Sequence, residues 1–132
     1  MAVAAPALPA ASAAVCRAVV AKLPEAVRDA RRRPVIAGAE QNAAYGDPPL
    51  TLACGAPAQP YAGTDEVWTL SDVCWLARPE AGRTVWTTLD RRVPVAVTVP
   101  GPKDGSAQWV IAFSDAVGTA DPPIAQPPRR CG

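Results

Sequence analysis

Apolar residues recur at helical spacing near each end of the chain, and this pattern predicts two helices. The first has its apolar face at Val15, Cys16, Val19, Val20 and Leu23. Ser12 precedes that face as an N-cap, and Pro24 interrupts it. The second helix would begin after the capping residue Ser106 and end at Gly118. Its expected buried residues are Trp109, Val110, Phe113 and Val117.

Between these helices the pattern changes to the alternation of apolar and polar residues that is typical of strands. The expected strands cover residues 50–54, 67–77, 84–90 and 93–99. A turn over residues 78–83 joins the middle two. Pro94 cannot donate a ladder hydrogen bond, so the last strand is expected at a sheet edge or with an irregular backbone. Residues 34–48 contain several residues that break regular structure and are expected to be irregular.

The order of elements is helix, strand, hairpin, strand, helix, without the strand–helix alternation that builds parallel sheets. We therefore expect an α+β fold, a small antiparallel sheet of about four strands with two helices packed on one face. Residues 12–120 would form a single domain. Residues 1–11 lack a basic start and are interpreted as a flexible segment left after removal of a signal or anchor. Residues 121–132 are a Pro-rich tail.

Composition limits what this domain could do. The chain of 132 residues has a formal net charge of +1, whereas a nucleic-acid-binding domain usually presents a strongly basic face. It contains no histidine, which excludes histidine-dependent triads, histidine metal ligands and histidine proton transfer. No run of about 18 apolar residues is present, so we expect no membrane span. We also expect no nucleic acid, no metal and no cofactor.

The four cysteines suggest two disulfides and an oxidising compartment, although three pairings are open. Cys16 lies on the first helix and Cys54 ends a strand, whereas Cys74 lies within a strand and Cys131 in a tail that needs a tether. We predict the pairs Cys16–Cys54 and Cys74–Cys131, which would staple the fold. Free thiols are one alternative. A metal site is another, but the cysteine spacings match no zinc module.

Two of the four tryptophans flank the expected hairpin. If the hairpin turns between Glu80 and Ala81, Trp75 lies directly opposite Trp86. The two rings could form an exposed platform that stacks on a sugar or on a partner protein. The alternative, which we favour, places them in the core, because large aromatic residues are usually mostly buried.

Arginines offer a second candidate surface. Arg31, Arg32 and Arg33 are consecutive, and two further arginine pairs lie at residues 91–92 and 129–130. If these residues gather on one side, they could meet anionic lipid head groups or wall polymers. The alternative is scattered, solvated charge.

The carboxylates give a weaker signal. Asp47 precedes Pro48 and could act as an acid or lie beside an anion site, but we favour its interpretation as a turn residue. Asp72 and Asp90 flank the hairpin, but the expected register makes them diagonal neighbours at best. Acid–base catalysis needs two carboxylates in a shared cleft, so we do not favour this pair as a catalytic site.

Several short motifs carry a resemblance to a known family. They are Cys16 with Leu23-Pro24, Ala44-Tyr45-Gly46-Asp47-Pro48-Pro49, Leu52-Ala53-Cys54-Gly55, Val73-Cys74-Trp75, Trp86-Thr87-Thr88 with Arg91, and Val95-Ala96-Val97-Thr98-Val99-Pro100. The chain resembles an actinobacterial family of secreted or membrane-anchored proteins catalogued as domain of unknown function thirty-five fifteen. The Gly-Asp-Pro-Pro…Cys-Gly block is its most specific part, and Tyr45 stands where the family would have Trp. The resemblance implies an envelope protein with an N-terminal signal or anchor, and it implies no activity.

Together these observations favour a non-catalytic binding or scaffolding module, secreted or anchored at the outer face of the cell membrane. Its candidate binding surface consists of Trp75, Trp86, Arg31, Arg32 and Arg33. Its partner would be an envelope protein or a cell-wall component, and it would meet the membrane only through the removed anchor. The alternative is a small enzyme that uses carboxylates on cell-wall or lipid substrates. Two carboxylates facing each other across a pocket would favour the enzyme, and an exposed aromatic patch would favour binding.

Overall fold

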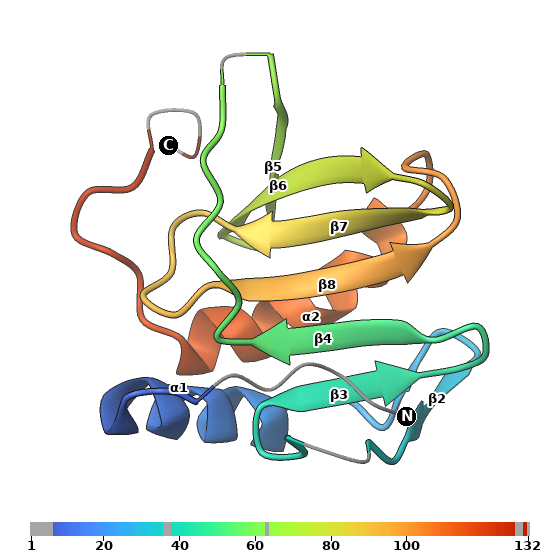
Figure 1. Cartoon of the computed structure of the whole chain (residues 1–132), viewed down its shortest axis with the longest axis horizontal. Coiled ribbons are helices and arrows are strands. Elements are labelled where there is room, and N and C mark those ends of the chain that lie inside the picture. Colours follow the sequence, from blue (N-terminus) through green and yellow to red (C-terminus); the bar gives the residue numbers. More distant parts are fainter. Residues whose placement is uncertain (1–6, 36–37, 63, 129–130, 132) are drawn as a thin grey trace.

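The computed structural model describes residues 7–35, 38–62, 64–128 and 131, which form two helices and eight strands (Figure 1). In chain order they are α1 (Ala10–Ala21), β1 (Ala26–Val27), β2 (Ala30–Arg33), β3 (Asn42–Tyr45), β4 (Leu50–Cys54), β5 (Glu66–Leu70), β6 (Val73–Glu80), β7 (Arg83–Thr88), β8 (Val95–Pro100) and α2 (Ala107–Ala120). The strands form one antiparallel sheet in the order β1-β2-β3-β4-β8-β7-β6-β5. The α+β class is confirmed, but the sheet has eight strands instead of about four.

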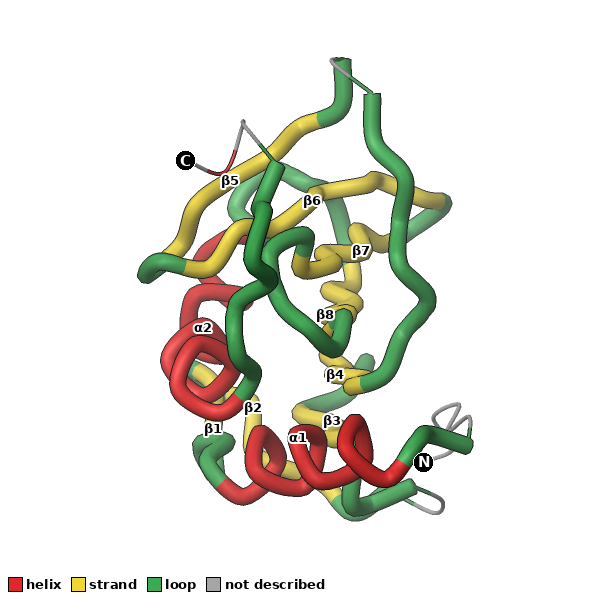
Figure 2. The backbone as a smooth tube through the Cα atoms, turned by 90° about the vertical axis from the view of Figure 1, so that its left-hand side faces the viewer, coloured by secondary structure: helices red, strands yellow, loops and turns green. Residues whose placement is uncertain are grey.

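Helix α2 lies on one face of the sheet, where it contacts β6 and β8, and α1 packs against α2 (Figures 1 and 2). The long connection after β4 crosses the opposite face. The apolar face predicted for α1 is correct, since Cys16, Val19, Val20 and Leu23 are buried. Residue Ala10 begins the helix with Pro9 at the N-cap position, so Ser12 lies inside the helix and is not its cap.

Helix α2 also differs from its predicted limits. Ser106 occupies the N-cap position but makes no side-chain cap bond, and its hydroxyl donates to the carbonyl of Lys103 at 2.6 Å. The helix continues past Gly118 to Ala120, and Asp121 is its C-cap. Val110, Phe113 and Val117 are buried as expected. Trp109 is only half-buried, because it lies about 100° around the helix from Val110 and outside the sheet-facing stripe.

The expected strand over residues 67–77 is in fact a hairpin of β5 and β6. Ser71 and Asp72 form its turn with φ values of +47° and +68°. Two consecutive residues with positive φ are what a tight two-residue hairpin requires, and Asp tolerates this conformation better than most residues. Pro94 was predicted to mark either an edge strand or an irregular backbone. The strand is not at an edge, because β8 lies between β4 and β7, and Pro94 lies outside it, since β8 begins at Val95.

The turn between β6 and β7 lies one residue later than predicted. Glu80 pairs with Arg83, so Ala81 and Gly82 form the turn. Gly82 has a φ of +73°, which glycine adopts without steric cost. As a result Trp75 lies opposite Thr88, and Trp86 lies opposite Ala77. The predicted Trp75–Trp86 pairing is therefore wrong, although both side chains still lie on the same face of the sheet.

The structure forms both predicted disulfides. Cys16–Cys54 joins α1 to the end of β4 with a Cα–Cα distance of 5.5 Å. Cys74–Cys131 joins β6 to the C-terminal tail with a Cα–Cα distance of 5.4 Å. Two disulfides are typical of a protein that folds in an oxidising, extracytoplasmic compartment. Within the described residues, neither helix has the length and apolar content to cross a bilayer.

Candidate functional site

The proposed tryptophan platform is not on the surface. Trp75 is 0% exposed and Trp86 is 1% exposed, and both rings pack toward α2. The indole N–H of Trp75 donates to the hydroxyl of Ser114 at 3.0 Å, and that of Trp86 donates to the hydroxyl of Ser106 at the same distance. Both tryptophans therefore belong to the core, which is the alternative that the sequence favoured.

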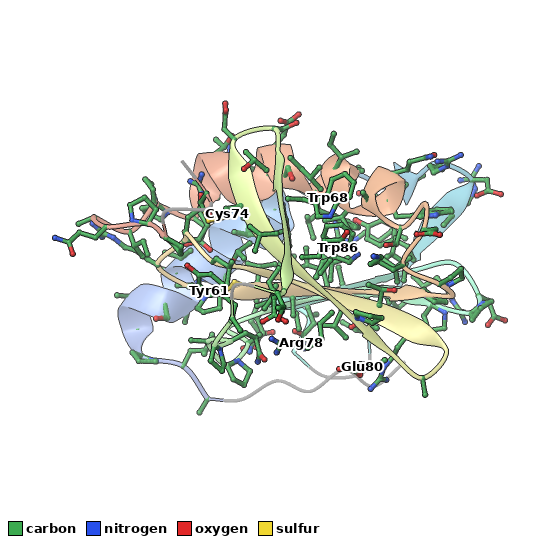
Figure 3. All side chains as sticks on the ribbon, turned by 90° about the horizontal axis from the view of Figure 1, so that it is seen from above. Tyr61, Trp68, Cys74, Arg78, Glu80 and Trp86 are labelled. Atoms are coloured by element: carbon green, nitrogen blue, oxygen red, sulfur yellow. A yellow bond between two sulfur atoms is a disulfide. The ribbon has the colours of Figure 1, made fainter. Side chains whose placement is uncertain are left out.

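The exposed tryptophan of the sheet is one that the sequence analysis did not single out. Trp68 lies on β5 directly opposite Trp75 and is 44% exposed. Its ring meets Trp86 edge-on, with a centroid distance of 6.1 Å (Figure 3). Among the described strands β5 is the last of the sheet, so Trp68 lies at a sheet edge.

The three consecutive arginines lie on β2 and do not form a single patch. Arg31 and Arg33 are exposed, whereas Arg32 is half-buried and pairs with Tyr45 of β3. Successive side chains of a strand point to opposite faces, so Arg32 is separated from its two neighbours. Arg33 donates to the carbonyl oxygen of Gly46 at 3.1 Å. Arg129 and Arg130 lie outside the described residues.

Asp72 and Asp90 do not form a carboxylate pair. Asp90 is buried and accepts the backbone N–H of Cys74 at 3.2 Å, whereas Asp72 is exposed in the β5–β6 turn. Arg91 donates through Nη2 to the Asp72 carbonyl oxygen at 2.9 Å, and its Nε lies 3.4 Å from Oδ1 of Asp90. The cluster positions the loop after β7, so its role is structural.

Asp121 completes this cluster where the C-terminal tail begins. Its Oδ1 accepts the backbone N–H of Val93 at 3.1 Å, and its carbonyl oxygen accepts from Arg91 at 3.2 Å. Burial raises the pKa of the Asp121 carboxyl to about 6, an effect that the Val93 N–H and Arg91 partly oppose and Asp90 reinforces. Between about pH 4 and pH 6 the folded state thus retains a proton that the unfolded chain releases. The ionised carboxyl therefore costs up to about 3 kcal/mol of stability as the pH rises through that window.

The substitution Asp121→Asn should remove this pH dependence, because Asn keeps an oxygen for the Val93 N–H and cannot ionise. The difference in the free energy of unfolding between Asp121→Asn and the wild type should therefore shift in favour of the variant by up to about 3 kcal/mol between pH 4 and pH 7.5. Urea unfolding at both pH values measures the difference, with Asp115→Asn on the exposed face of α2 as the control. Parallel pH profiles for the wild type and Asp121→Asn would contradict the prediction.

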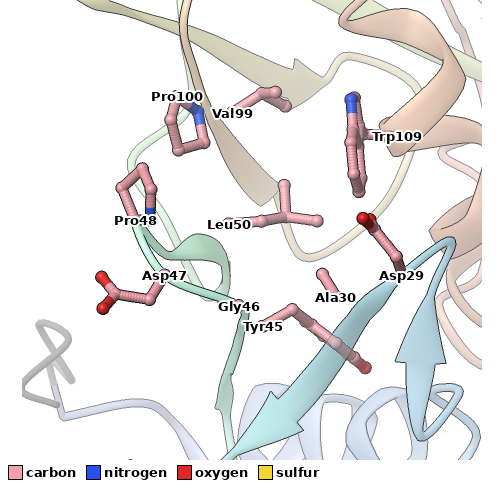
Figure 4. A pocket seen from close by; sticks show the side chains of 10 residues that line it. All are labelled: Asp29, Ala30, Tyr45, Gly46, Asp47, Pro48, Leu50, Val99, Pro100 and Trp109. Carbon is pink, nitrogen blue, oxygen red and sulfur yellow. The ribbon is translucent and has the colours of Figure 1, made fainter.

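A pocket of about 380 Å³ opens where the β1–β2 turn, the β3–β4 turn, β8 and α2 meet (Figure 4). It is lined by residues 29–30, 45–48 and 50, by residues 99–100, and by Trp109. Its volume lies in the range of small-ligand sites. One wall contains Gly46, Asp47 and Pro48, which belong to the motif that carries the family resemblance.

The β3–β4 wall is held in place by buried contacts. Gly46 has a φ of +71°, and a Cβ atom there would lie 3.0 Å from Cβ of Ala30, so only glycine lets the turn pack closely against β2. Tyr45 is buried against Phe113, with a ring centroid distance of 5.4 Å. Its hydroxyl donates to the Pro24 carbonyl oxygen at 2.6 Å. Burial raises the pKa of Tyr45 to about 12, so the hydroxyl remains a donor at physiological pH.

Trp109 forms the opposite wall and separates this pocket from a neighbouring one. The neighbouring pocket is lined by Arg28 and Gln108 as well as by Trp109. The guanidinium carbon of Arg28 lies 5.1 Å from the centroid of the Trp109 ring, and Arg28 also donates a hydrogen bond to Gln108. Arg28 lines this neighbouring pocket and is not among the residues that line the larger one.

Two carboxylates line the pocket, but they do not face each other. Asp29 extends toward the Trp109 side, whereas the carboxylate of Asp47 turns away from the pocket (Figure 4). From the sequence, a turn was the favoured role of Asp47 over an acid or a neighbour of an anion site, and Asp29 had no predicted role. No pattern in the sequence distinguishes Asp29 from other exposed carboxylates, and the helical periodicity assigned Trp109 to the core.

Comparison with known families decides the affiliation of the chain. A family model described as "Protein of unknown function (DUF3515)" matches residues 1–124. The chain belongs to the DUF3515 family. The DUF3515 match includes every residue that lines the pocket, whereas Cys131 lies beyond its end. No curated protein and no solved structure matches the chain.

Proposed function

We propose that this DUF3515 protein is a non-catalytic binding module of the cell envelope, located on the extracytoplasmic side of the membrane. The observation that carries the proposal is the pocket between the β3–β4 turn and Trp109, which combines an apolar floor, an aromatic wall and a carboxylate at its edge. This combination is typical of a site that binds a ligand. Its partner would be an envelope protein or a cell-wall component.

Two further observations support this proposal. The two disulfides fit an oxidising compartment. The orientation of the carboxylates gives less support to the alternative, a carboxylate-dependent enzyme. General acid–base catalysis needs two groups that reach the same bond, and Asp47 turns away from the space that Asp29 borders.

Capture from the detergent-solubilised envelope of the source organism tests the proposal. The wild type should retain a defined envelope protein or wall fragment, and Trp109→Ala should reduce its recovery at least about tenfold, because ring contacts contribute strongly to binding. Trp68→Ala is the matched control, since it removes an exposed ring outside the pocket. Urea unfolding of both variants would establish that they are folded. Equal recovery with the wild type and folded Trp109→Ala would refute the assignment of binding to this pocket.

A further inference from the structure

We propose that the pocket binds a cationic side chain, lysine or arginine, of a partner polypeptide. This inference rests on the proposed function, because it names the ligand class of the same pocket. It is carried by the charge of the lining residues, by the position of the Trp109 ring and by the apolar floor.

The charge of the pocket is one-sided. Among the described residues that line it, Asp29 and Asp47 are charged and none is basic. In the described part of the chain, no hydrogen bond or ion pair engages either carboxylate. An ionised carboxylate can only accept hydrogen bonds, so a ligand that replaces water beside the exposed Asp29 must bring donors. A cationic donor gives the strongest hydrogen bond to such a group.

The aromatic wall fits the same ligand. The face of an indole ring attracts cations, and the guanidinium carbon of Arg28 already lies over Trp109, 5.1 Å from the ring centroid. The near side of the ring borders the pocket and lies beside Asp29 (Figure 4). A cation placed there would contact the ring and the carboxylate together.

The floor of the pocket accommodates the stem of such a side chain. Leu50 and Val99 form an apolar surface between the two walls, and Pro48 and Pro100 border it on the other side (Figure 4). Lysine and arginine carry their charge at the end of several methylene groups, which can pack on apolar surface while the charge remains outside.

Single amino-acid derivatives provide a direct test with the intact protein. The probes are Nα-acetyl-lysine methylamide and Nα-acetyl-arginine methylamide, and the uncharged controls are the corresponding norleucine and citrulline derivatives. We expect the two cationic probes to shift the indole N–H signal of Trp109 in NMR spectra, with dissociation constants on the order of millimolar. The neutral derivatives should bind at least about tenfold more weakly.

A matched pair of variants locates the charge contact. Asp29→Asn should weaken the binding of the cationic probes about tenfold. The variant should fold normally, because Asn is well tolerated in the tight turn that Asp29 occupies. Asp115→Asn, on the exposed face of α2, should leave binding unchanged. Equal binding of the neutral derivatives, or full binding by Asp29→Asn, would overturn the cationic assignment. Absence of any shift with the cationic probes would also overturn it. None of these results would refute the envelope-binding proposal, which the comparison of Trp109→Ala with Trp68→Ala decides separately.

Discussion

Replacing Trp75 by Ala is expected to lower the free energy of unfolding by about 3–5 kcal/mol, as measured by urea or guanidinium unfolding. Trp75 is 0% exposed and is among the largest fully buried side chains described in the structure. Its removal would leave a cavity between β6 and α2, and the Ser114 hydroxyl would lose the indole N–H that it accepts. Both effects act in the same direction, because neither a cavity nor an unpaired buried hydroxyl can be relieved without movement of the helix.

Trp68→Ala is the control for this substitution, because Trp68 is the cross-strand neighbour of Trp75 on β5. Trp68 is 44% exposed and meets Trp86 edge-on, so its loss should cost about 1 kcal/mol or less. The two variants remove the same side chain from paired positions and differ mainly in burial. Similar small losses for both would show that Trp75 does not belong to the core.

The tryptophans also show what the sequence can predict about the sheet. The alternation correctly predicted that Trp75 and Trp86 lie on the same face of the sheet. The turn lies one residue later than predicted, which shifts each cross-strand partner by two positions, and residues two positions apart on a strand share a face. The alternation could not show that this face is the one that α2 covers. The opposite face of β6 is also buried, since Leu76 is 1% exposed beneath the connection after β4. A strand buried on both faces lacks the polar positions that would distinguish them.

The strands β2 and β3 were not predicted from the sequence, because their local patterns are not typical of strands. β2 consists of Ala30 and three arginines, and β3 consists of two alanines between Asn42 and Tyr45. Neither segment shows alternation or a high strand propensity. Both become strands because β4 offers an edge with which β3 pairs, and β3 in turn pairs with β2. Such tertiary pairing leaves little trace in the local sequence, which is why only about four strands were predicted.

The pocket was predictable in part. The motif Gly46-Asp47-Pro48 was identified as specific, and the structure places it in the pocket wall. Asp29 reaches the same pocket from the short β1–β2 hairpin, which depends on the unpredicted pairing of β1, β2 and β3. Trp109 reaches it from the flank of the predicted helix α2. The candidate surface of the sequence analysis therefore contained none of the lining residues.

The two disulfides are expected to contribute unequally, and the larger effect belongs to the shorter loop. Cys16–Cys54 joins positions 38 residues apart, and Cys74–Cys131 joins positions 57 residues apart. Loop-closure entropy alone predicts a loss of about 4 kcal/mol for each, slightly more for the longer loop. The replacement of Cys16 and Cys54 by Ala should reach that value, because both residues are buried in the core and hold α1 against β4.

Replacement of Cys74 and Cys131 by Ala should cost less than this entropy predicts. Cys131 is only half-buried, and Ile124 is the last tail residue before it with a described backbone hydrogen bond to the domain, donated to the Asp90 carbonyl oxygen at 2.9 Å. Without the disulfide the end of the tail can move in the folded state as well, so the folded and unfolded states both gain entropy. Urea unfolding of the two double variants shows which of them loses more stability. Proteolysis should cleave the tail of the Cys74/Cys131 variant while its domain remains folded. A larger loss of stability for the Cys74/Cys131 variant would show instead that the tail is an integral part of the folded domain.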